Sequence, residues 1–523
     1  MASVKVDTLG RPQMPETQPV RETISEAEER FERIRRTTGL FLAPALFLLI
    51  YFWPMPGLKP QAHTLAAVMA FTITCWITEC IPIPVASLLG PTLAVAFGVA
   101  GAKEAYTAMA DPTVLLFLGG FVLAKAMEVH GLDRRFALRI LSLGSVSRTS
   151  TMILLGVGGV TCFLSMWLSN TATAAMMFPI TMGVLLALNR IIASMHGREV
   201  NNSKYQTGML LMIAYAASIG GMGTPIGTPP NMITIGLIEK ATGLRIAFFQ
   251  WMMLAVPIML LMFLVMWVYF NWRCPSIQKD LKGAADFIAT ERKALGTWKR
   301  GEANALIAFL VAVALWVTPG VIALVSGTTS PLFKAYNNIF PEASVALIAA
   351  SLLFFLPVNF QQREFTLSWK QAVNIDWGTL LLFGGGLSLG EMMFKTGLAE
   401  AMGKGLVSMT GAHTLLAITA LGQLVAILLT ETTSNTAAAT MVVPVVIGIA
   451  SAAGVNPIPP AVAAGLGASM AFVLPVSTPP NAIIYGSGMV PITQMVKYGF
   501  LLDVIGYFLV LAGVLILTPL VGL

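Results

Sequence analysis

Charged residues are scarce in this sequence: Asp, Glu, Lys and Arg together make up only 11% of its 523 residues. Soluble globular proteins carry about 25%, so this shortage argues against a water-soluble fold. Hydrophobic residues reach 56%, and the mean hydropathy is +0.78. Because apolar runs long enough to cross a ~30 Å hydrocarbon core recur along the chain, we expect an all-α integral membrane protein.

Cysteine and histidine are also scarce, with four of each. The cysteines are Cys75, Cys80, Cys162 and Cys274. They form no CxxC pair and no cluster with histidine, so we interpret them as small packing residues. Neither GxGD nor HExxH occurs, which excludes the corresponding intramembrane proteases. Gly467-Ala468-Ser469 resembles a serine-protease loop only weakly, and every histidine precedes it, so we do not favour an enzyme.

Residues 1–37 are polar and lack the features of a cleavable signal peptide. Pro12, Pro15 and Pro19 are followed by a charged run at 22–36, in which apolar residues recur at helical spacing. This segment either lies flat on the membrane or is a disordered tail. In both cases we expect a polar cytoplasmic extension.

The apolar runs predict about eleven transmembrane helices and two re-entrant hairpins. The spans are 40–58, 62–79, 86–101, 113–130, 207–237 (interrupted), 247–271, 303–324, 342–358, 376–395, 461–489 (interrupted) and 500–521. The hairpins, at 149–188 and 412–453, return to the side on which they begin. Because each hairpin returns to its starting side, the distribution of basic residues does not show whether it crosses the membrane twice or only re-enters it. The polar tips described below favour re-entry.

The basic residues indicate an orientation. With the N-terminus in the cytoplasm, 21 Lys and Arg residues fall in cytoplasmic connections and six in outer ones. This bias is the positive-inside pattern. We therefore expect a multi-pass protein of the cell (inner or plasma) membrane with its C-terminus outside. The bias also explains the net charge of +7 without a nucleic-acid partner.

Three segments of the first half of the chain recur, in the same order, in the second half. Residues 113–132 resemble 378–398, 165–180 resemble 430–445, and 223–236 resemble 474–486. Four full spans and one returning hairpin lie between the first matched pair, so its members run in opposite directions and the repeats are inverted. The two hairpins then open from opposite sides. Their tips can meet near the membrane midplane, where transporters with inverted repeats bind substrate.

Both hairpin tips carry the triplet Ser-Asn-Thr, and each triplet is followed later by Thr-Pro-Pro-Asn. The triplets are Ser169-Asn170-Thr171 and Ser434-Asn435-Thr436, and the TPPN motifs begin at Thr228 and Thr478. One triplet alone is explained by helix capping or interhelical hydrogen bonds, but two matched sets favour a ligand site. Asn and Thr donate hydrogen bonds to carboxylates, and the half-helix that begins at each tip adds free N–H groups. We expect a small organic dianion as the ligand.

Neither motif contains Arg or Lys, so a dianion there needs bound cations to offset its desolvation. Ser165 and Thr430 lie five residues before Asn170 and Asn435, and with the broken loops they supply neutral oxygens. Such oxygens suit a hard monovalent cation, which favours Na+ as the coupling ion. Glu431, where the first repeat has Met166, either supports the fold by hydrogen bonding or takes part in coupling. The same two roles are open for Glu79.

With these motifs, residues 40–523 resemble the divalent anion/Na+ symporter (DASS) family, which includes dicarboxylate and citrate carriers. The resemblance implies Na+-coupled symport of C4-dicarboxylates such as succinate, malate or fumarate by an elevator mechanism, in a homodimer. The implied substrate contacts are Asn170, Thr171, Thr228, Asn435, Thr436, Thr478 and Pro479. One implied Na+ site uses Ser165, Ser169, Asn170 and Gly227. The other uses Thr430, Ser434, Asn435 and Ser477.

The resemblance also implies a domain organisation. Residues 38–110 and 303–358 would form the scaffold, and 111–272 and 359–523 the two parts of the sliding transport domain. A cytoplasmic linker would cover 273–302. Segments 131–148 and 396–410 would be horizontal arms. Two opposed half-sites favour alternating access over a channel. The main alternative is a Na+-independent di- or tricarboxylate exchanger of the same family, against which the hydroxyls of Ser165 and Thr430 argue.

Overall fold

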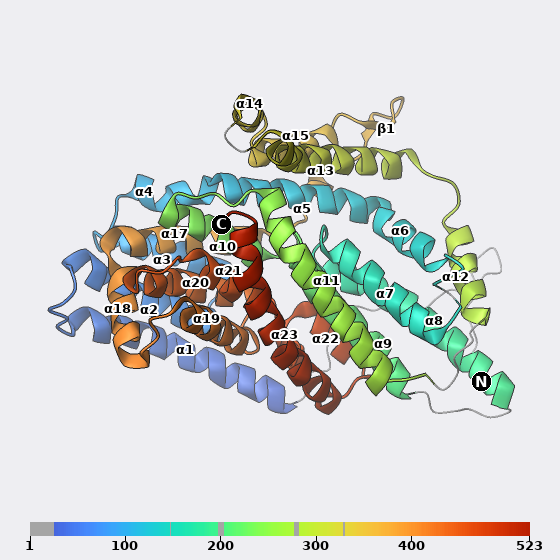
Figure 1. The fold of residues 1–523 in the computed structure, drawn as a ribbon, viewed down its shortest axis with the longest axis horizontal. Coiled ribbons are helices and arrows are strands. Elements are labelled where there is room, and N and C mark those ends of the chain that lie inside the picture. Colours follow the sequence, from blue (N-terminus) through green and yellow to red (C-terminus); the bar gives the residue numbers. More distant parts are fainter. Residues whose placement is uncertain (1–25, 147, 197–202, 277–281, 328–329) are drawn as a thin grey trace.

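The computed structural model describes residues 26–146, 148–196, 203–276, 282–327 and 330–523 (Figure 1). The first half contains α1 (Glu26–Phe52), α2 (Pro60–Thr78), α3 (Ile83–Ala96), α4 (Ala102–Thr107), the 3₁₀ helix η1 (Ala108–Ala110), α5 (Pro112–His130), α6 (Leu132–Leu141), α7 (Ser150–Ser165), α8 (Asn170–His196), α9 (Ser203–Gly221), α10 (Pro229–Thr242) and α11 (Phe248–Arg273).

The second half repeats much of this pattern. It contains α12 (Lys282–Ala294), α13 (Arg300–Ser326), α14 (Pro331–Ile339), α15 (Glu342–Leu352), β1 (Pro357–Asn359), β2 (Glu364–Phe365), α16 (Trp369–Ala372), α17 (Trp377–Thr396), α18 (Leu398–Thr410), α19 (Leu415–Thr430), α20 (Asn435–Ala452), α21 (Ile458–Gly467), the 3₁₀ helix η2 (Pro475–Ser477), α22 (Pro479–Gly486) and α23 (Ile492–Leu520).

Proline sets several helix boundaries. Pro54 and Pro56 follow the end of α1, and Pro112, Pro229 and Pro479 each occupy the first turn of a helix. Proline is tolerated in a first turn because the N–H that it lacks has no intrahelical partner there. In the part of the chain that the structure describes, seven helices are long and apolar enough to cross a membrane.

The interruptions expected from the sequence are present. Residues 222–228 separate α9 from α10, and residues 468–478, which include η2, separate α21 from α22. Both hairpins are helix pairs, α7–α8 and α19–α20, with short connections at the polar triplets. They lie toward opposite ends of the molecule in Figure 1, on the right and on the left respectively.

Other segments differ from expectation. The span expected at 342–358 contains only the 11-residue helix α15, because Pro357 and the polar turn after it form an antiparallel pair instead, in which Pro357 lies opposite Phe365. The span expected at 86–101 is the 14-residue α3. At the N-terminus, residues 26–37 of the expected extension form the first turns of α1; the rest of that extension lies outside the described residues.

The inverted repeat is visible in the packing. α5, in the first half of the chain, packs against α15 in the second half, and α17, in the second half, packs against α3 in the first. A Cβ at Gly119 would overlap the backbone of Ala346, and one at Gly385 would overlap the backbone of Ser87. Glycine in the matched sequences of α5 and α17 therefore permits two equivalent close helix contacts.

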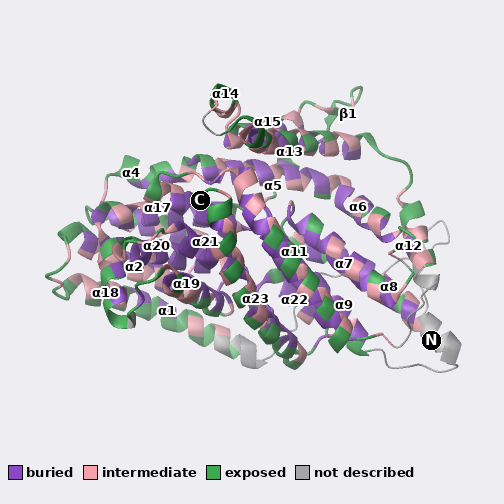
Figure 2. Ribbon diagram, viewed as in Figure 1, coloured by how far each residue is buried: buried purple, intermediate pink, exposed green. Residues whose placement is uncertain are grey.

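The core lies around the broken helices. Figure 2 shows α20 and α21 as largely buried, whereas α1 and α23 carry exposed stripes. Large apolar side chains are exposed on α1, α11, α13 and α23, among them Phe41, Leu264, Val321 and Phe508. A helix that is apolar on its exposed face suits contact with lipid.

Candidate functional site

The polar triplets begin the second helix of each hairpin. Ser169 Oγ accepts a hydrogen bond from Ala172 N at 3.2 Å, and Ser434 Oγ accepts one from Ala437 N at the same distance. Both serines are thus helix N-caps. The remaining N–H groups at the starts of α8 and α20, with the positive ends of their dipoles, point toward the tips.

The hydroxyls five residues upstream contact the tip asparagines. Ser165 Oγ donates to Asn170 Oδ1 at 2.7 Å. Thr430 Oγ1 lies 2.7 Å from both Asn435 Oδ1 and the carbonyl oxygen of Ala468. Because these contacts engage the amide oxygens, the amide N–H groups remain as donors for a ligand.

The asparagine that ends each TPPN motif forms hydrogen bonds with the broken loop that precedes it. Asn231 Nδ2 donates to the carbonyls of Gly221 (2.9 Å), Met222 (3.2 Å) and Thr224 (2.7 Å). Asn481 Nδ2 donates to Ala471 O (2.9 Å) and Leu474 O (3.0 Å). Carbonyls freed by the helix breaks therefore find partners inside the protein, which a membrane interior requires.

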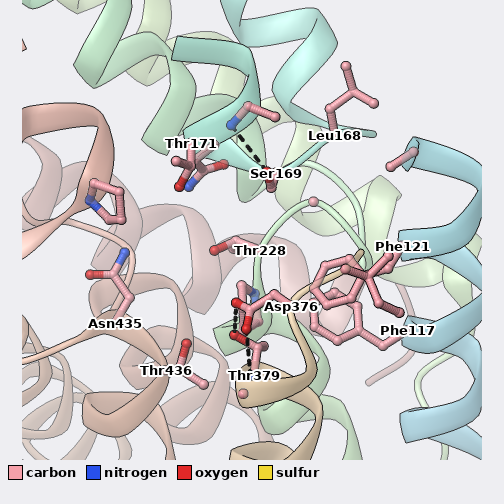
Figure 3. Close-up of a pocket in the computed structure, with 18 of the residues that line it drawn as sticks. Phe117, Phe121, Leu168, Ser169, Thr171, Thr228, Asp376, Thr379, Asn435 and Thr436 are labelled. Carbon is pink, nitrogen blue, oxygen red and sulfur yellow. Dashed lines mark hydrogen bonds between the residues drawn. The ribbon is translucent and has the colours of Figure 1, made fainter. Parts of the chain in front are cut away.

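Hairpin tips and broken loops meet at one cavity of about 610 Å³. All the candidate residues line it except Ser165 and Thr430, which lie fully buried behind the tips. Figure 3 shows Asn435 and Thr436 on one side of the cavity, Thr228 between, and Phe117 and Phe121 on the far side. A volume in this range suits a small ligand. The sequence thus predicted correctly which motifs come together.

Oxygens gather around the first tip. A Cβ at Gly221 would lie 2.5 Å from Asn170 Oδ1 and 3.2 Å from Gly227 O, and one at Gly227 would lie 2.9 Å from Met166 O. Carbonyl, amide and hydroxyl oxygens converge here within a small volume. Such a neutral donor set fits Na+, and only glycine leaves the space open.

The second tip repeats part of this arrangement. Ser477, in η2, and Thr478 are buried and line the same cavity as Ser434 and Asn435. The Ser477 hydroxyl donates to Leu474 O at 2.5 Å, and its oxygen accepts from Asn481 Nδ2 at 3.4 Å. A hydroxyl oxygen has two lone pairs, so one remains for a cation. Neutral oxygens near this tip also fit Na+.

The charged residues of the cavity wall come mainly from the last turns of α5 and the start of α17. They include Lys125 and Glu128 near the end of α5, together with Asp376 at the start of α17. At the opposite ends of these two helices, Lys240 Nζ lies 3.0 Å from Asp111 Oδ2 and 3.4 Å from Glu391 Oε2. Asp111 and Asp376 are equivalent N-caps of α5 and α17. Asp111 pairs with Lys240, whereas Asp376 lines the cavity.

The structure favours a supporting role for the two glutamates singled out above. Glu431 accepts hydrogen bonds from the backbone N–H groups of Phe472 and its two successors. Glu79 has a left-handed backbone conformation, with φ of 48°, and its carboxylate lies 3.5 Å from Arg35. Ser469 Oγ, the candidate nucleophile of the disfavoured protease, is buried without a hydrogen-bond partner.

A family model described as the sodium:sulfate symporter transmembrane region matches residues 35–523. The chain belongs to this family. The resemblance to the divalent anion/Na+ symporters is therefore confirmed, and with it a helical multi-pass membrane transporter. Curated relatives align with nearly the whole chain.

Two relatives and one solved structure illustrate this similarity. The sodium-dependent dicarboxylate transporter SdcS of Staphylococcus saprophyticus is 34% identical over 502 residues, which cover 95% of this chain and 94% of the relative. An uncharacterized transporter of Haemophilus influenzae is 38% identical over 469 residues, which cover 88% and 92%. The crystal structure of the Alcanivorax borkumensis YdaH transporter has a TM-score of 0.51 at 12% identity, covering 93% of this chain and 97% of that one. This last similarity concerns the fold alone.

Proposed function

We propose that this sodium:sulfate symporter family member couples the inward movement of Na+ to uptake of a C4-dicarboxylate such as succinate, malate or fumarate. The observation that carries the proposal is the meeting of two Ser-Asn-Thr tips, from oppositely oriented repeats, in one cavity. Neutral donors there suit two carboxylate groups, and the oxygens behind them suit Na+. The name of SdcS, a sodium-dependent dicarboxylate transporter, supports the same substrate class and ion.

Substrate contacts are proposed for Asn170, Thr171, Thr228, Asn435, Thr436, Thr478 and Pro479. Na+ would be held at one site by Ser165, Ser169, Asn170 and Gly227, and at the other by Thr430, Ser434, Asn435 and Ser477. Each tip asparagine then serves both ligands, since its Oδ1 faces a cation and its Nδ2 faces a carboxylate. Binding of Na+ and of the dianion would consequently favour one another.

Because all the proposed substrate and Na+ contacts lie on the hairpins and broken helices, these elements would move together as one unit. Such an elevator movement would take place in each protomer of a homodimer. The close packing of α5 on α15 and of α17 on α3 supports counting α5 and α17 with the scaffold, whereas the sequence had suggested the transport domain. The boundary would then run along the cavity wall. α6 and α18 correspond to the two expected arms.

With the N-terminus cytoplasmic, the C-terminus lies outside and the charged end of the cavity faces the cytoplasm. The ion pairs of Lys240 with Asp111 and Glu391, called the Lys240 cluster below, would then close the cavity on its outer side. Lys240→Met should weaken this closure by leaving Asp111 and Glu391 without their shared cation. The ratio of inward-open to outward-open protein should fall by a factor of up to about five, as expected for a partly exposed ion pair worth about 1 kcal/mol.

The measurement for this variant uses Ala124→Cys, at a position that lines the cavity, in a background without the native cysteines. An impermeant maleimide applied from the cytoplasmic side should label the introduced thiol several-fold more slowly when Lys240 is replaced by methionine. Lys404→Met is the matched control, because Lys404 forms an ion pair with exposed Glu400, one turn away on the same helix. Equal labelling rates in all variants would refute a closing role for Lys240.

Uptake of labelled succinate into proteoliposomes tests the function. With an inward Na+ gradient, uptake should exceed the value in choline chloride at least tenfold, and it should not require a dicarboxylate inside the vesicles. Equal uptake with and without Na+, dependent on internal dicarboxylate, would instead establish the exchanger alternative.

A further inference from the structure

A second, smaller cavity lies between the first two turns of α9 and those of α23. It has a volume of about 120 Å³ and is lined by Ser203, Lys204, Thr207, Gln494, Lys497 and Tyr498. Three of these residues come from α9 and three from α23. Figure 1 shows the starts of both helices along the lower edge of the molecule. No residue is shared with the lining of the substrate cavity, so this pocket is a separate feature.

The lining side chains are all hydrogen-bond donors, and two of them carry a positive charge. Lys204 and Lys497 form no ion pair with any residue that the structure describes. The Lys497 ammonium group lies 6.0 Å from the centre of the Tyr498 ring. No acidic side chain lines the pocket. Two cations that share a pocket without an acidic partner favour an anionic ligand.

Thr207 gives independent evidence for a polar ligand. Its side chain lines the pocket and is only 8% exposed, yet its hydroxyl makes no hydrogen bond with the part of the chain that the structure describes. Thr161 and Thr234, by contrast, each donate to the carbonyl oxygen four residues earlier in their helices. Leaving a buried hydroxyl unpaired costs free energy. A ligand held by the two lysines would supply the missing partner.

The helices that carry these groups are firmly packed. A Cβ at Gly208, on α9, would lie only 2.7 Å from Cys274 Cβ at the end of α11. The ring of Tyr498, on α23, lies 5.9 Å from that of Phe270, also on α11. α11 therefore holds the starts of α9 and α23 together. Because the donors are already in place, little ordering is needed when a ligand binds.

Exposed apolar side chains run along α23 and α11 beside the pocket. On α23 they recur every four residues, and so lie on one face of the helix, at Val496, Phe500, Val504 and Phe508. On α11 the exposed apolar residues are Leu261, Leu264, Val268 and Trp272. The guanidinium group of Arg273 lies 5.2 Å from the centre of the Trp272 ring. Basic and aromatic residues at the end of an apolar face are typical of the membrane interface.

The equivalent place in the other repeat lacks the basic residues. α21 precedes the second broken loop as α9 precedes the first, and α11 follows the first TPPN helix as α23 follows the second. The first two turns of α21 and of α11 contain no Lys or Arg. The basic pocket therefore occurs on one face only, which in the proposed orientation is the cytoplasmic one. Anionic lipids are abundant in the cytoplasmic leaflet, and basic pockets between transmembrane helices bind their head groups.

We propose that the pocket between α9 and α23 binds the phosphate group of an anionic phospholipid of the cytoplasmic leaflet. Lys204 and Lys497 contact the phosphate oxygens, Thr207 donates a hydrogen bond, and the acyl chains follow the apolar faces of α23 and α11. The lipid thus joins α9, which leads into the first broken loop, to α23, which packs on the second; a Cβ at Gly499 would overlap Phe472 O. The inference does not depend on Na+ or on the transported substrate.

Thermal unfolding of the purified full chain in detergent tests the site. Phosphatidylglycerol, phosphatidylcholine or inorganic phosphate is added in choline chloride at constant ionic strength. Phosphatidylglycerol should raise the unfolding temperature with saturation, and the other two should not do so over the same concentrations. Lys204→Gln combined with Lys497→Gln should raise the half-saturating phosphatidylglycerol concentration about thirtyfold, since each lysine near an anionic membrane surface contributes a factor of about five. Thr207→Val, which keeps the side-chain size, should raise it several-fold.

Lys293→Gln combined with Lys370→Gln is the matched control, because it removes the same charge from exposed positions of α12 and α16; the half-saturating concentration should not change. An equal response of the wild type and of the Lys204 and Lys497 double variant would overturn the inference, as would equal stabilisation by phosphatidylcholine. An unchanged response of folded Thr207→Val would contradict it too. Saturation by inorganic phosphate at the same concentrations would assign the pocket to free phosphate and refute the lipid. None of these outcomes bears on Na+-coupled uptake.

Discussion

Replacing Asn435 with alanine is expected to abolish succinate uptake while leaving a folded, stable protein. The amide has two tasks in this account: Oδ1, 2.7 Å from Thr430 Oγ1, contributes to a cation site, and Nδ2 donates to a carboxylate. Hydrogen bonds to charged groups are worth about 1.5–3 kcal/mol each. Losing a substrate contact and a cation ligand together should reduce uptake by at least about a hundredfold.

Asn170→Ala should have the same effect, since Ser165 and Asn170 repeat the arrangement in the first hairpin. Initial rates of Na+-driven uptake in proteoliposomes measure the loss, and size-exclusion chromatography with thermal unfolding checks the fold. Leu186→Ala, at an exposed position farther along α8, is a suitable control and should retain uptake. Substantial uptake by either asparagine variant would show that its tip is outside the binding site.

Gly220→Ala is expected to prevent assembly of the hairpin bundle. Gly220 lies near the end of α9, fully enclosed, where an added Cβ would overlap the backbone carbonyl of Cys162 on α7. Backbone atoms of a packed helix cannot move aside as a flexible side chain can, so the helices must separate. Overpacking typically costs about 1–3 kcal/mol and occasionally more. We expect the upper end of this range for an overlap with backbone, and the broken loop that follows α9 would be displaced as well.

Gly159→Ala provides the comparison for this effect. Gly159 lies on α7 itself, and a Cβ there would meet only the tip of the Phe263 ring, at 3.8 Å. Because alanine favours a helix more than glycine does, this variant should express and unfold like the wild type. Thermal unfolding in detergent measures both proteins. Normal stability of Gly220→Ala would contradict the tight α7–α9 contact.

The sequence was sufficient to predict the hairpins and the helix breaks. Repeated Ser-Asn-Thr and Thr-Pro-Pro-Asn motifs combine a helix cap with a proline in a first turn, and such local signals act over only a few residues. The inverted order of the repeats then implied that the tips meet. The cavity lined by Asn170, Thr228, Asn435 and Thr478 agrees with that prediction.

Features that depend on distant contacts were missed. Asn231 and Asn481 belong to the quoted motifs, but their role in tying loop carbonyls depends on how residues seven to ten positions earlier fold back. Asp503 is the one acidic residue of helix α23, and no neighbour in sequence indicates that it interacts with Glu431. The Lys240 cluster likewise joins three helices that are far apart in the chain.

Equilibrium binding of succinate to the purified protein tests the central claim most directly. Calorimetric titrations in NaCl and in choline chloride at equal ionic strength would report the coupling free energy between Na+ and the dianion. The account predicts binding in NaCl and an affinity at least tenfold weaker, or no detectable binding, in choline chloride. Equal affinity in the two salts would contradict a cavity whose dianion site depends on bound Na+.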